Sequence, residues 1–328
     1  MQEKVIYISP YENQNEFISI LKNIFSDMGF VVQDMEEITA IKSNARRGEL
    51  AVINWLEDSP CYENSFCKSF KTFVRTIKKA VLLKRRTKKV FWIRHNYRPH
   101  DRNLGQTFSR ILTWLFTLLD FHVLVLESTF EGDLVLHPLY VTDEEASEII
   151  KKISTSESEK QDKVLFFGAI KPYKNLHVAL DTWPQELPLL IIGKCSDKSY
   201  FEKLLKIVDD RGLKVTLKNT FLSKEDLDTL LMEYSYILMP HQDQTIISSG
   251  TFYHAISFGC KIIALNSTFS MHKASQHNFL IIKEDFTNLI LDLDSNKVTR
   301  SEVIYDAVNS YGKIESIKCW ESLFKIVN

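Results

Sequence analysis

Small hydroxyl residues and a glycine stand together late in the chain, where a helix is expected to begin. Residues 239–265 read MPHQDQTIISSGTFYHAISFGCKIIAL, and the helix is predicted to open at Ser248, Ser249, Gly250 and Thr251. The first turn of a helix offers free N–H groups and the positive end of the helix dipole, which together bind phosphate. The tetrapeptide could equally be a plain helix cap. His241 in the preceding loop and His254, about one turn into the helix, are candidates for the same ligand.

A second group of residues follows the strand predicted at 164–168. The segment FFGAIKPYKN, residues 166–175, contains Gly168, Lys171 and Lys174. The glycine allows close approach of the backbone to a ligand. The two lysines could neutralise phosphate as point charges, although lysines in a loop can also be simply solvated. The two segments together predict a diphosphate site in the second half of the chain.

Acid–base candidates lie in the first half of the chain. Transfer of a group to a hydroxyl needs a base that takes up the hydroxyl proton. His95 directly follows the strand predicted at 90–94, Asp101 lies in the same loop, and Glu57 lies next to Trp55 after another strand. A histidine after an apolar strand can also be structural. We rank His95 first, Asp101 second and Glu57 third.

Residues 66–89 form a basic amphipathic segment. Apolar side chains recur at helical spacing, the lysines and arginines fall largely on other faces, and no acidic residue lies between Glu63 and His100. A solvated helix face explains this pattern. Attraction to anionic lipid, worth about 1 kcal/mol per basic residue near the surface, explains it as well.

The overall composition excludes several classes of protein. The chain has 328 residues, a net charge of −1 and 45% hydrophobic residues, so no global field points to nucleic acid. Its five cysteines show no metal-binding spacing, and an odd, scattered set indicates reduced thiols. No apolar run reaches the about 20 residues of a membrane span, and no DxD motif stands at a strand end. We therefore expect a cytoplasmic protein without a signal peptide, metal or cofactor.

Strand and helix patterns alternate along the chain, which predicts α/β architecture with parallel sheets covered on both faces. The polar stretch 142–162 interrupts the alternation and is predicted to contain the linker: its first part could be helical, and its second part is expected to be the linker itself. This division gives one domain at 1–141 and a second at 163–311. The amphipathic segment 312–328 is expected to pack as a helix, with the N-terminal domain as one option.

These segments, in this order, resemble bacterial GT-B-fold glycosyltransferases that make exopolysaccharide and O-antigen. Three segments of the first half carry the same resemblance: VINWLEDSP at 52–60, VFWIRHNYRPH at 90–100 and LHPLY at 136–140. The resemblance implies two Rossmann-like doubly wound domains that face each other across a cleft, with residues 1–141 as the acceptor-side domain and a nucleotide-sugar donor bound in the domain at 163–311. It also implies a glycan or polyprenyl-diphosphate-linked acceptor, and with it attachment of residues 66–89 to the inner face of the plasma membrane.

Two departures from the family pattern leave alternatives open. The E-x7-E pattern of retaining members is absent, and Ala169 stands where an arginine is usual. Retaining and inverting chemistry therefore both remain open. A nucleotide-sugar epimerase of the same fold, or a non-catalytic partner subunit of a transferase, would account for the same sequence.

Overall fold

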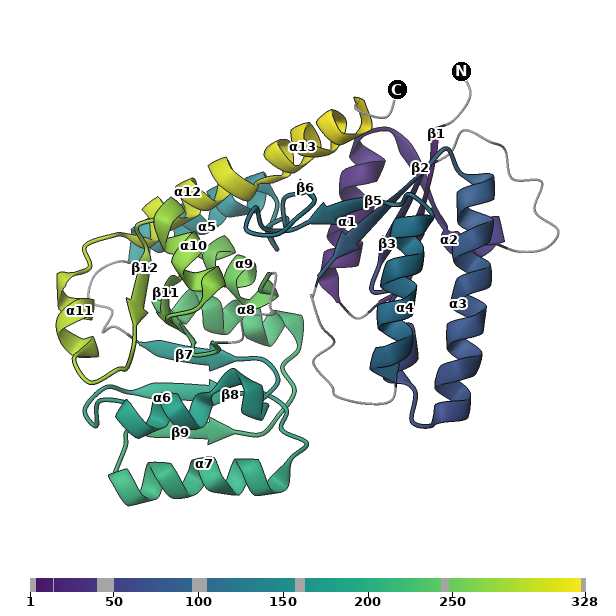
Figure 1. Ribbon diagram of the computed structural model, residues 1–328. Coiled ribbons are helices and arrows are strands. Elements are labelled where there is room, and N and C mark those ends of the chain that lie inside the picture. The colour runs from purple at the N-terminus through teal and green to yellow at the C-terminus, as the bar shows by residue number, and fades with distance from the viewer. Residues whose placement is uncertain are drawn as a thin grey trace. The chain divides into compact units, whose positions relative to one another are not determined.

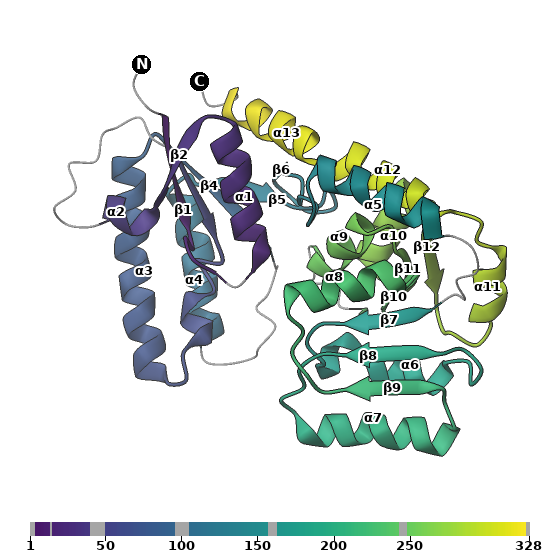
Figure 2. The ribbon, with the colours of Figure 1, turned by 180° about the vertical axis from the view of Figure 1, so that it is seen from behind.

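The computed structural model describes residues 4–13, 15–39, 50–95, 105–156, 163–242 and 248–325. The chain forms two compact units (Figures 1 and 2). The first consists mainly of Met1–Pro138 and Lys313–Asn328, and the second mainly of Leu139–Gln244 and Ser249–Gly312. Asp101 and the rest of its loop lie outside the described residues.

The first unit is built on a parallel six-stranded sheet with the order β2-β1-β3-β4-β5-β6. The strands are β1 (Lys4–Ser9), β2 (Phe30–Asp34), β3 (Leu50–Asn54), β4 (Lys89–Arg94), β5 (His122–Val125) and β6 (Asp133–Leu134). Helices α1 (Glu16–Asp27) and α13 (Lys313–Lys325) share one core with the sheet. A second core joins the sheet to α2 (Met35–Thr39), α3 (Phe66–Arg86) and α4 (Gly105–Leu118). The sheet is therefore covered on both faces, as continuous apolar strands require.

The C-terminal helix α13 belongs to the first unit, although the 170 residues of the second unit separate it from β6 in the sequence. Trp320 and Phe324 pack against Phe25 of α1, with ring centroids 4.9 and 6.1 Å apart. Lys313 of α13 forms an ion pair with Asp27 at 2.6 Å. An amphipathic helix must bury its apolar face, and α13 does so on α1.

The second unit repeats this architecture, with the strand order β12-β11-β10-β7-β8-β9, all parallel. Its strands are β7 (Val164–Phe167), β8 (Leu189–Ile192), β9 (Val215–Lys218), β10 (Tyr236–Met239), β11 (Lys261–Leu265) and β12 (Leu280–Lys283). Its helices are α5 (Asp143–Ser156), α6 (Leu176–Thr182), α7 (Lys198–Arg211), α8 (Lys224–Glu233), α9 (Gly250–Ser257), α10 (Thr268–Gln276), α11 (Leu289–Ser295) and α12 (Arg300–Tyr311). Strands β7, β10 and β11 are buried along their whole length.

The two doubly wound parallel sheets confirm the α/β fold class that the sequence predicts. In the stretch 142–162, α5 occupies the first part, where a helix was one option, and packs against α12 within the second unit. At the start of α5, the Thr142 N–H donates to Glu145 Oε2 at 2.7 Å, and the Glu145 N–H donates to Thr142 Oγ1 at 3.1 Å, as in a capping box. The part of this stretch at 157–162 lies outside the described residues.

Candidate functional site

The candidate residues lie where the strand order of each sheet reverses. In open α/β sheets, ligands bind outside the carboxyl ends of the strands at this switch point. In the second sheet the switch lies between β7 and β10, and in the first it lies between β1 and β3. The loop after β7 holds Gly168, Lys171 and Lys174, and the chain after β10 leads to α9. His95 and Glu57 follow β4 and β3 of the first unit.

The loop after β7 requires glycine for close backbone packing. Gly168 has φ +100°, a conformation that side chains rarely adopt. A β-carbon added to Gly193, which directly follows β8, would lie 1.8 Å from the Gly168 carbonyl oxygen. The strand ends of β7 and β8 therefore meet backbone to backbone. Sequence reasoning missed Gly193, although a glycine directly after an apolar strand is a usable signal.

Lys174 is a half-buried cation beside this glycine. A β-carbon on Gly168 would lie 3.4 Å from Lys174 Nζ, and Nζ lies 5.4 Å from the centroid of the Phe166 ring. Burial, with the neighbouring Lys171 charge, lowers the pKa of Lys174 from 10.5 to about 8. No carboxylate of the described residues forms an ion pair with Lys174. An anion bound here would relieve both the desolvation and the repulsion between the two lysines.

The start of α9 has no side-chain cap. Ser249 occupies the N-cap position and is 8% exposed, yet its hydroxyl makes no capping hydrogen bond to the first turn. The buried Oγ of Ser248 has no hydrogen-bond partner among the described residues. A plain cap would use one of these hydroxyls in this way. Thr251 is half-buried in the first turn, and His241 is half-buried two residues after β10.

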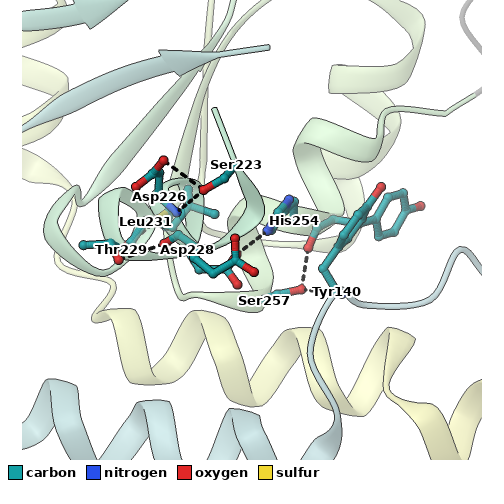
Figure 3. A network of polar contacts seen from close by, with 11 residues as sticks. Tyr140, Ser223, Asp226, Asp228, Thr229, Leu231, His254 and Ser257 are labelled. Carbon is teal, nitrogen blue, oxygen red and sulfur yellow. Dashed lines mark hydrogen bonds and ion pairs between the residues drawn. The ribbon is translucent and has the colours of Figure 1, made fainter. Parts of the chain in front are cut away.

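His254 belongs to a network of polar contacts at α9 that also contains Asp228, Tyr140 and Ser257 (Figure 3). His254 is buried, its Nε2 lies 2.9 Å from Asp228 Oδ1 of α8, and its ring stacks on Tyr140 at 4.4 Å. The Tyr140 N–H donates to Ser257 Oγ at 2.9 Å. A β-carbon on Gly250 would lie 2.7 Å from the Tyr140 hydroxyl oxygen. Packing therefore also requires the glycine, and this requirement was not visible in the sequence.

His95 is held by aromatic rings and one hydrogen bond in the first unit. Its ring stacks on Trp55 at 4.0 Å and meets Phe17 edge-on at 5.0 Å. Its Nε2 lies 2.9 Å from Asn54 Oδ1. Burial, with the nearby His137, lowers the pKa of His95 well below its usual value. The imidazole is therefore neutral at pH 7 and can accept a proton.

Glu57 is a buried carboxyl next to a second one. It is 5% exposed, and burial together with the adjacent Asp58 raises its pKa to about 8. Burial also raises the pKa of Asp58, whose Oδ1 accepts a hydrogen bond from Ser109 Oγ at 3.0 Å. A carboxyl with a pKa of about 8 is protonated at neutral pH and is then a donor rather than a base.

Neither metal-binding clusters nor membrane-spanning helices are found in the described part of the chain. No three His, Cys, Asp or Glu side chains there converge in a way that could hold a metal ion. No described helix combines the length and hydropathy needed to cross a bilayer.

Solved glycosyltransferases share this fold over nearly the whole chain. HepE from Anabaena, in complex with UDP and glucose, is 12% identical, with 99% of this chain and 100% of that chain covered and a TM-score of 0.63. AviGT4, a glycosyltransferase involved in avilamycin A biosynthesis, is 11% identical, with 99% and 97% covered and a TM-score of 0.58. The trehalose-6-phosphate synthase OtsA is 9% identical, with 98% and 99% covered and a TM-score of 0.59.

The sequence itself matches no family model and no curated protein. The likeness in structure therefore defines the fold, which is the GT-B fold of glycosyltransferases.

Proposed function

We propose that this protein is a glycosyltransferase that moves a sugar from a nucleotide-sugar donor to a glycan or lipid-linked saccharide during surface polysaccharide synthesis. The observation that carries the proposal is the positive charge at the switch point of the second unit. There Lys171 and Lys174, after β7, have no ion-pair partner among the described residues. Helix α9, which follows the neighbouring strand β10, begins without a side-chain cap from the described residues. A diphosphate would supply the missing negative charge.

The roles of individual residues follow from their chemistry. Gly168 and the first turn of α9 would let the backbone approach the diphosphate, and the two lysines would stabilise the leaving group. His95, neutral and aromatic-packed, would take the proton of the acceptor hydroxyl. Asp101 remains a carboxylate alternative. Glu57 fits the base role less well because its carboxyl is protonated at neutral pH.

Nucleotide binding is the direct test. Thermal unfolding would be measured with UDP, GDP, dTDP and CMP, with UDP first because HepE was solved with UDP and with UDP-glucose. A nucleotide at about 100 times its dissociation constant should add about 2.7 kcal/mol to the free energy of unfolding. Failure of all four to bind would favour a non-catalytic partner subunit. Conversion of a sugar nucleotide without any acceptor would favour an epimerase.

We also propose that helices α3 and α4 bring the enzyme to an anionic membrane surface. Among the basic residues of α3, Lys79 pairs with Glu36, Lys84 with Asp120 at 3.2 Å, and Arg86 donates to the Ile38 carbonyl at 2.7 Å. The other five recur at helical spacing, are exposed and have no ion-pair partner among the described residues: Lys68, Lys71, Arg75, Lys78 and Arg85.

Exposed apolar side chains lie on the same two helices as these five basic residues. Phe66 and Phe70 of α3 contact Phe108 of α4, with ring centroids 5.6 and 5.9 Å apart. On α4 itself, Trp114 is 63% exposed and lies one turn from the exposed Ile111 and Leu118. Neither helix contains an acidic residue. Tryptophan beside basic residues suits the interface of an anionic bilayer.

Vesicle binding tests this partner. The triple variant Lys71→Gln, Arg75→Gln, Lys78→Gln should bind phosphatidylglycerol vesicles at least tenfold more weakly, since each basic residue contributes about 1 kcal/mol. Lys198→Gln, Lys203→Gln, Lys206→Gln on the exposed face of α7 removes the same charge and should leave binding unchanged. Equal binding to neutral phosphatidylcholine vesicles, or equal loss in both triple variants, would contradict the proposal.

A further inference from the structure

Two hydrogen bonds of Asn54 connect the ends of three neighbouring strands in the first unit. Asn54 is the last residue of β3 and is 2% exposed. Its Nδ2 donates to the carbonyl oxygen of Ser9, at the end of β1, at 3.2 Å. Its Oδ1 lies 2.9 Å from Nε2 of His95, directly after β4. The bridge therefore spans the switch point between β1 and β3 and reaches the candidate base.

The chemistry of these partners fixes the proton on His95. A backbone carbonyl oxygen can only accept, so the NH₂ group of Asn54 must face Ser9 and its Oδ1 must face His95. That oxygen also only accepts, so Nε2 of His95 must carry the hydrogen. The neutral ring then has its lone pair on Nδ1, and no hydrogen bond of the described residues uses Nδ1. A ring nitrogen's protonation is set in this way by the bond that the other nitrogen makes.

The surroundings keep the ring in this orientation. Trp55, which follows Asn54, has the left-handed conformation φ +53°, and its ring stacks on His95 with an interplanar angle of 25°. Phe17 of α1 packs edge-on against the His95 ring, with an interplanar angle of 87°. A non-glycine residue in the left-handed region is uncommon and tends to persist where the surrounding structure demands it. Here the backbone turn places an aromatic plane against the imidazole.

We propose that Asn54 is a positioning residue that holds His95 in the Nε2–H tautomer, so that Nδ1 is free to accept the proton of the acceptor hydroxyl. The proposal deepens the proposed function and depends on it for the identity of the proton donor. The tautomer itself does not depend on it. The two parts can therefore fail separately.

The tautomer is measured directly by long-range ¹H–¹⁵N correlation spectra of the labelled full-length protein at pH 7. His95→Gln assigns the signals. We expect Nδ1 to give the resonance of an unprotonated nitrogen and Nε2 that of a protonated one. In Asn54→Ala the preference should weaken to a mixture of both tautomers. An Nδ1–H tautomer in the unchanged protein would overturn the proposal, whatever the protein catalyses.

Turnover then tests the functional part. Asn54→Ala should lower kcat for glycosyl transfer by about twofold or more per folded molecule, in proportion to the share of the Nδ1–H tautomer in the spectra, because a base in the wrong tautomer cannot accept the proton, while nucleotide affinity stays unchanged. Ser69→Ala is the matched control: Ser69 is also 2% exposed, lies in the same unit, and donates one hydrogen bond to the Pro60 carbonyl at 2.9 Å. It should lose similar stability and keep its kcat.

Asn54→Asp separates tautomer from fold. One carboxyl oxygen can still accept from Nε2–H, so the tautomer should remain, while the other oxygen replaces the NH₂ group that donates to the Ser9 carbonyl. Asn54→Asp should therefore lose stability but, unlike Asn54→Ala, keep most of its turnover per folded molecule. Normal kcat in Asn54→Ala, with transfer measurable in the unchanged protein, refutes the positioning role. Absence of any transfer refutes the proposed function instead.

Discussion

Replacing Lys174 with methionine should make the protein more stable and less able to bind its nucleotide. The substitution keeps the length of the side chain and removes a half-buried charge that no carboxylate of the described residues balances. A binding residue of this kind lowers the free energy of unfolding of the protein without ligand. A purely structural or solvated lysine would not show opposite effects on stability and binding.

The size of the stability gain follows from the pKa. Burial and Lys171 lower the pKa of Lys174 from 10.5 to about 8. Each pKa unit corresponds to about 1.4 kcal/mol, which gives an upper limit of about 3 kcal/mol. Because the side chain is partly exposed, solvent screening reduces this, and we expect a gain of about 1–2 kcal/mol at pH 7, or a few degrees in Tm.

The pH dependence has a defined sign. Between pH 8 and 10.5 the unfolded chain holds the Lys174 proton more tightly than the folded one, so deprotonation favours the folded state. This group's contribution to the free energy of unfolding therefore rises with pH across that window. The difference between Lys174→Met and the unchanged protein should be largest below pH 8 and should shrink as the pH approaches 10.5.

Calorimetry on one preparation measures both effects. UDP affinity should fall at least tenfold, about 1.4 kcal/mol, while any affinity for uridine, which has no phosphate, should be retained. Lys206→Met on the exposed side of α7 makes the same chemical change away from the site and should alter neither quantity. A Lys174→Met protein that melts earlier, or one that binds UDP as before, would show that Lys174 is not an uncompensated phosphate ligand.

Three further outcomes are expected. His95→Ala should lower turnover by about 100- to 10,000-fold with little change in nucleotide affinity, whereas early melting with near-normal turnover of the folded protein would refute a catalytic role. Gly250→Ala should lower both stability and UDP binding, because its β-carbon would lie 2.7 Å from the Tyr140 hydroxyl oxygen. The double variant Gly250→Ala, Tyr140→Phe should regain stability but not UDP binding. If it also regains binding, Gly250 serves packing only. Transfer activity should persist in EDTA, since lysines and N–H groups can meet the diphosphate charge; loss that magnesium or manganese restores would contradict this.

The fold was predictable because its signals are periodic and local. Strands such as VLFF at β7 and YILM at β10 are continuous apolar runs, and the structure buries every residue of both. The placement of candidate residues directly after strands was predictable as well, and the carboxyl ends of parallel strands must meet at one edge of a sheet. The extent of α5 was harder to predict, because a polar exposed helix and a linker have similar composition.

The contacts of the candidate residues were not predictable from sequence. The packing around Gly250 is one example, because its neighbour Tyr140 lies 110 positions away in the chain. The hydrogen bond of His254 was not predictable either, because its partner Asp228 belongs to the preceding helix and no sequence motif marks it. Asn54 lies inside the recognised segment VINWLEDSP, yet only the fold brings Ser9 and His95 to its two ends.

The electrostatics of the two units support the division into donor and acceptor sides without reference to any relative. At the second unit's switch point, Lys174 keeps a charge that no described carboxylate neutralises, which favours an anionic ligand. At the first unit's strand ends, the candidate groups are neutral at pH 7: His95 because burial lowers its pKa, and Glu57 because burial raises its pKa to about 8. A diphosphate would gain little from these neutral groups, whereas the neutral imidazole of His95 has a nitrogen lone pair that can accept the proton of a sugar hydroxyl. These electrostatics favour placing the charged part of the proposed reaction at the second unit and the proton transfer at the first.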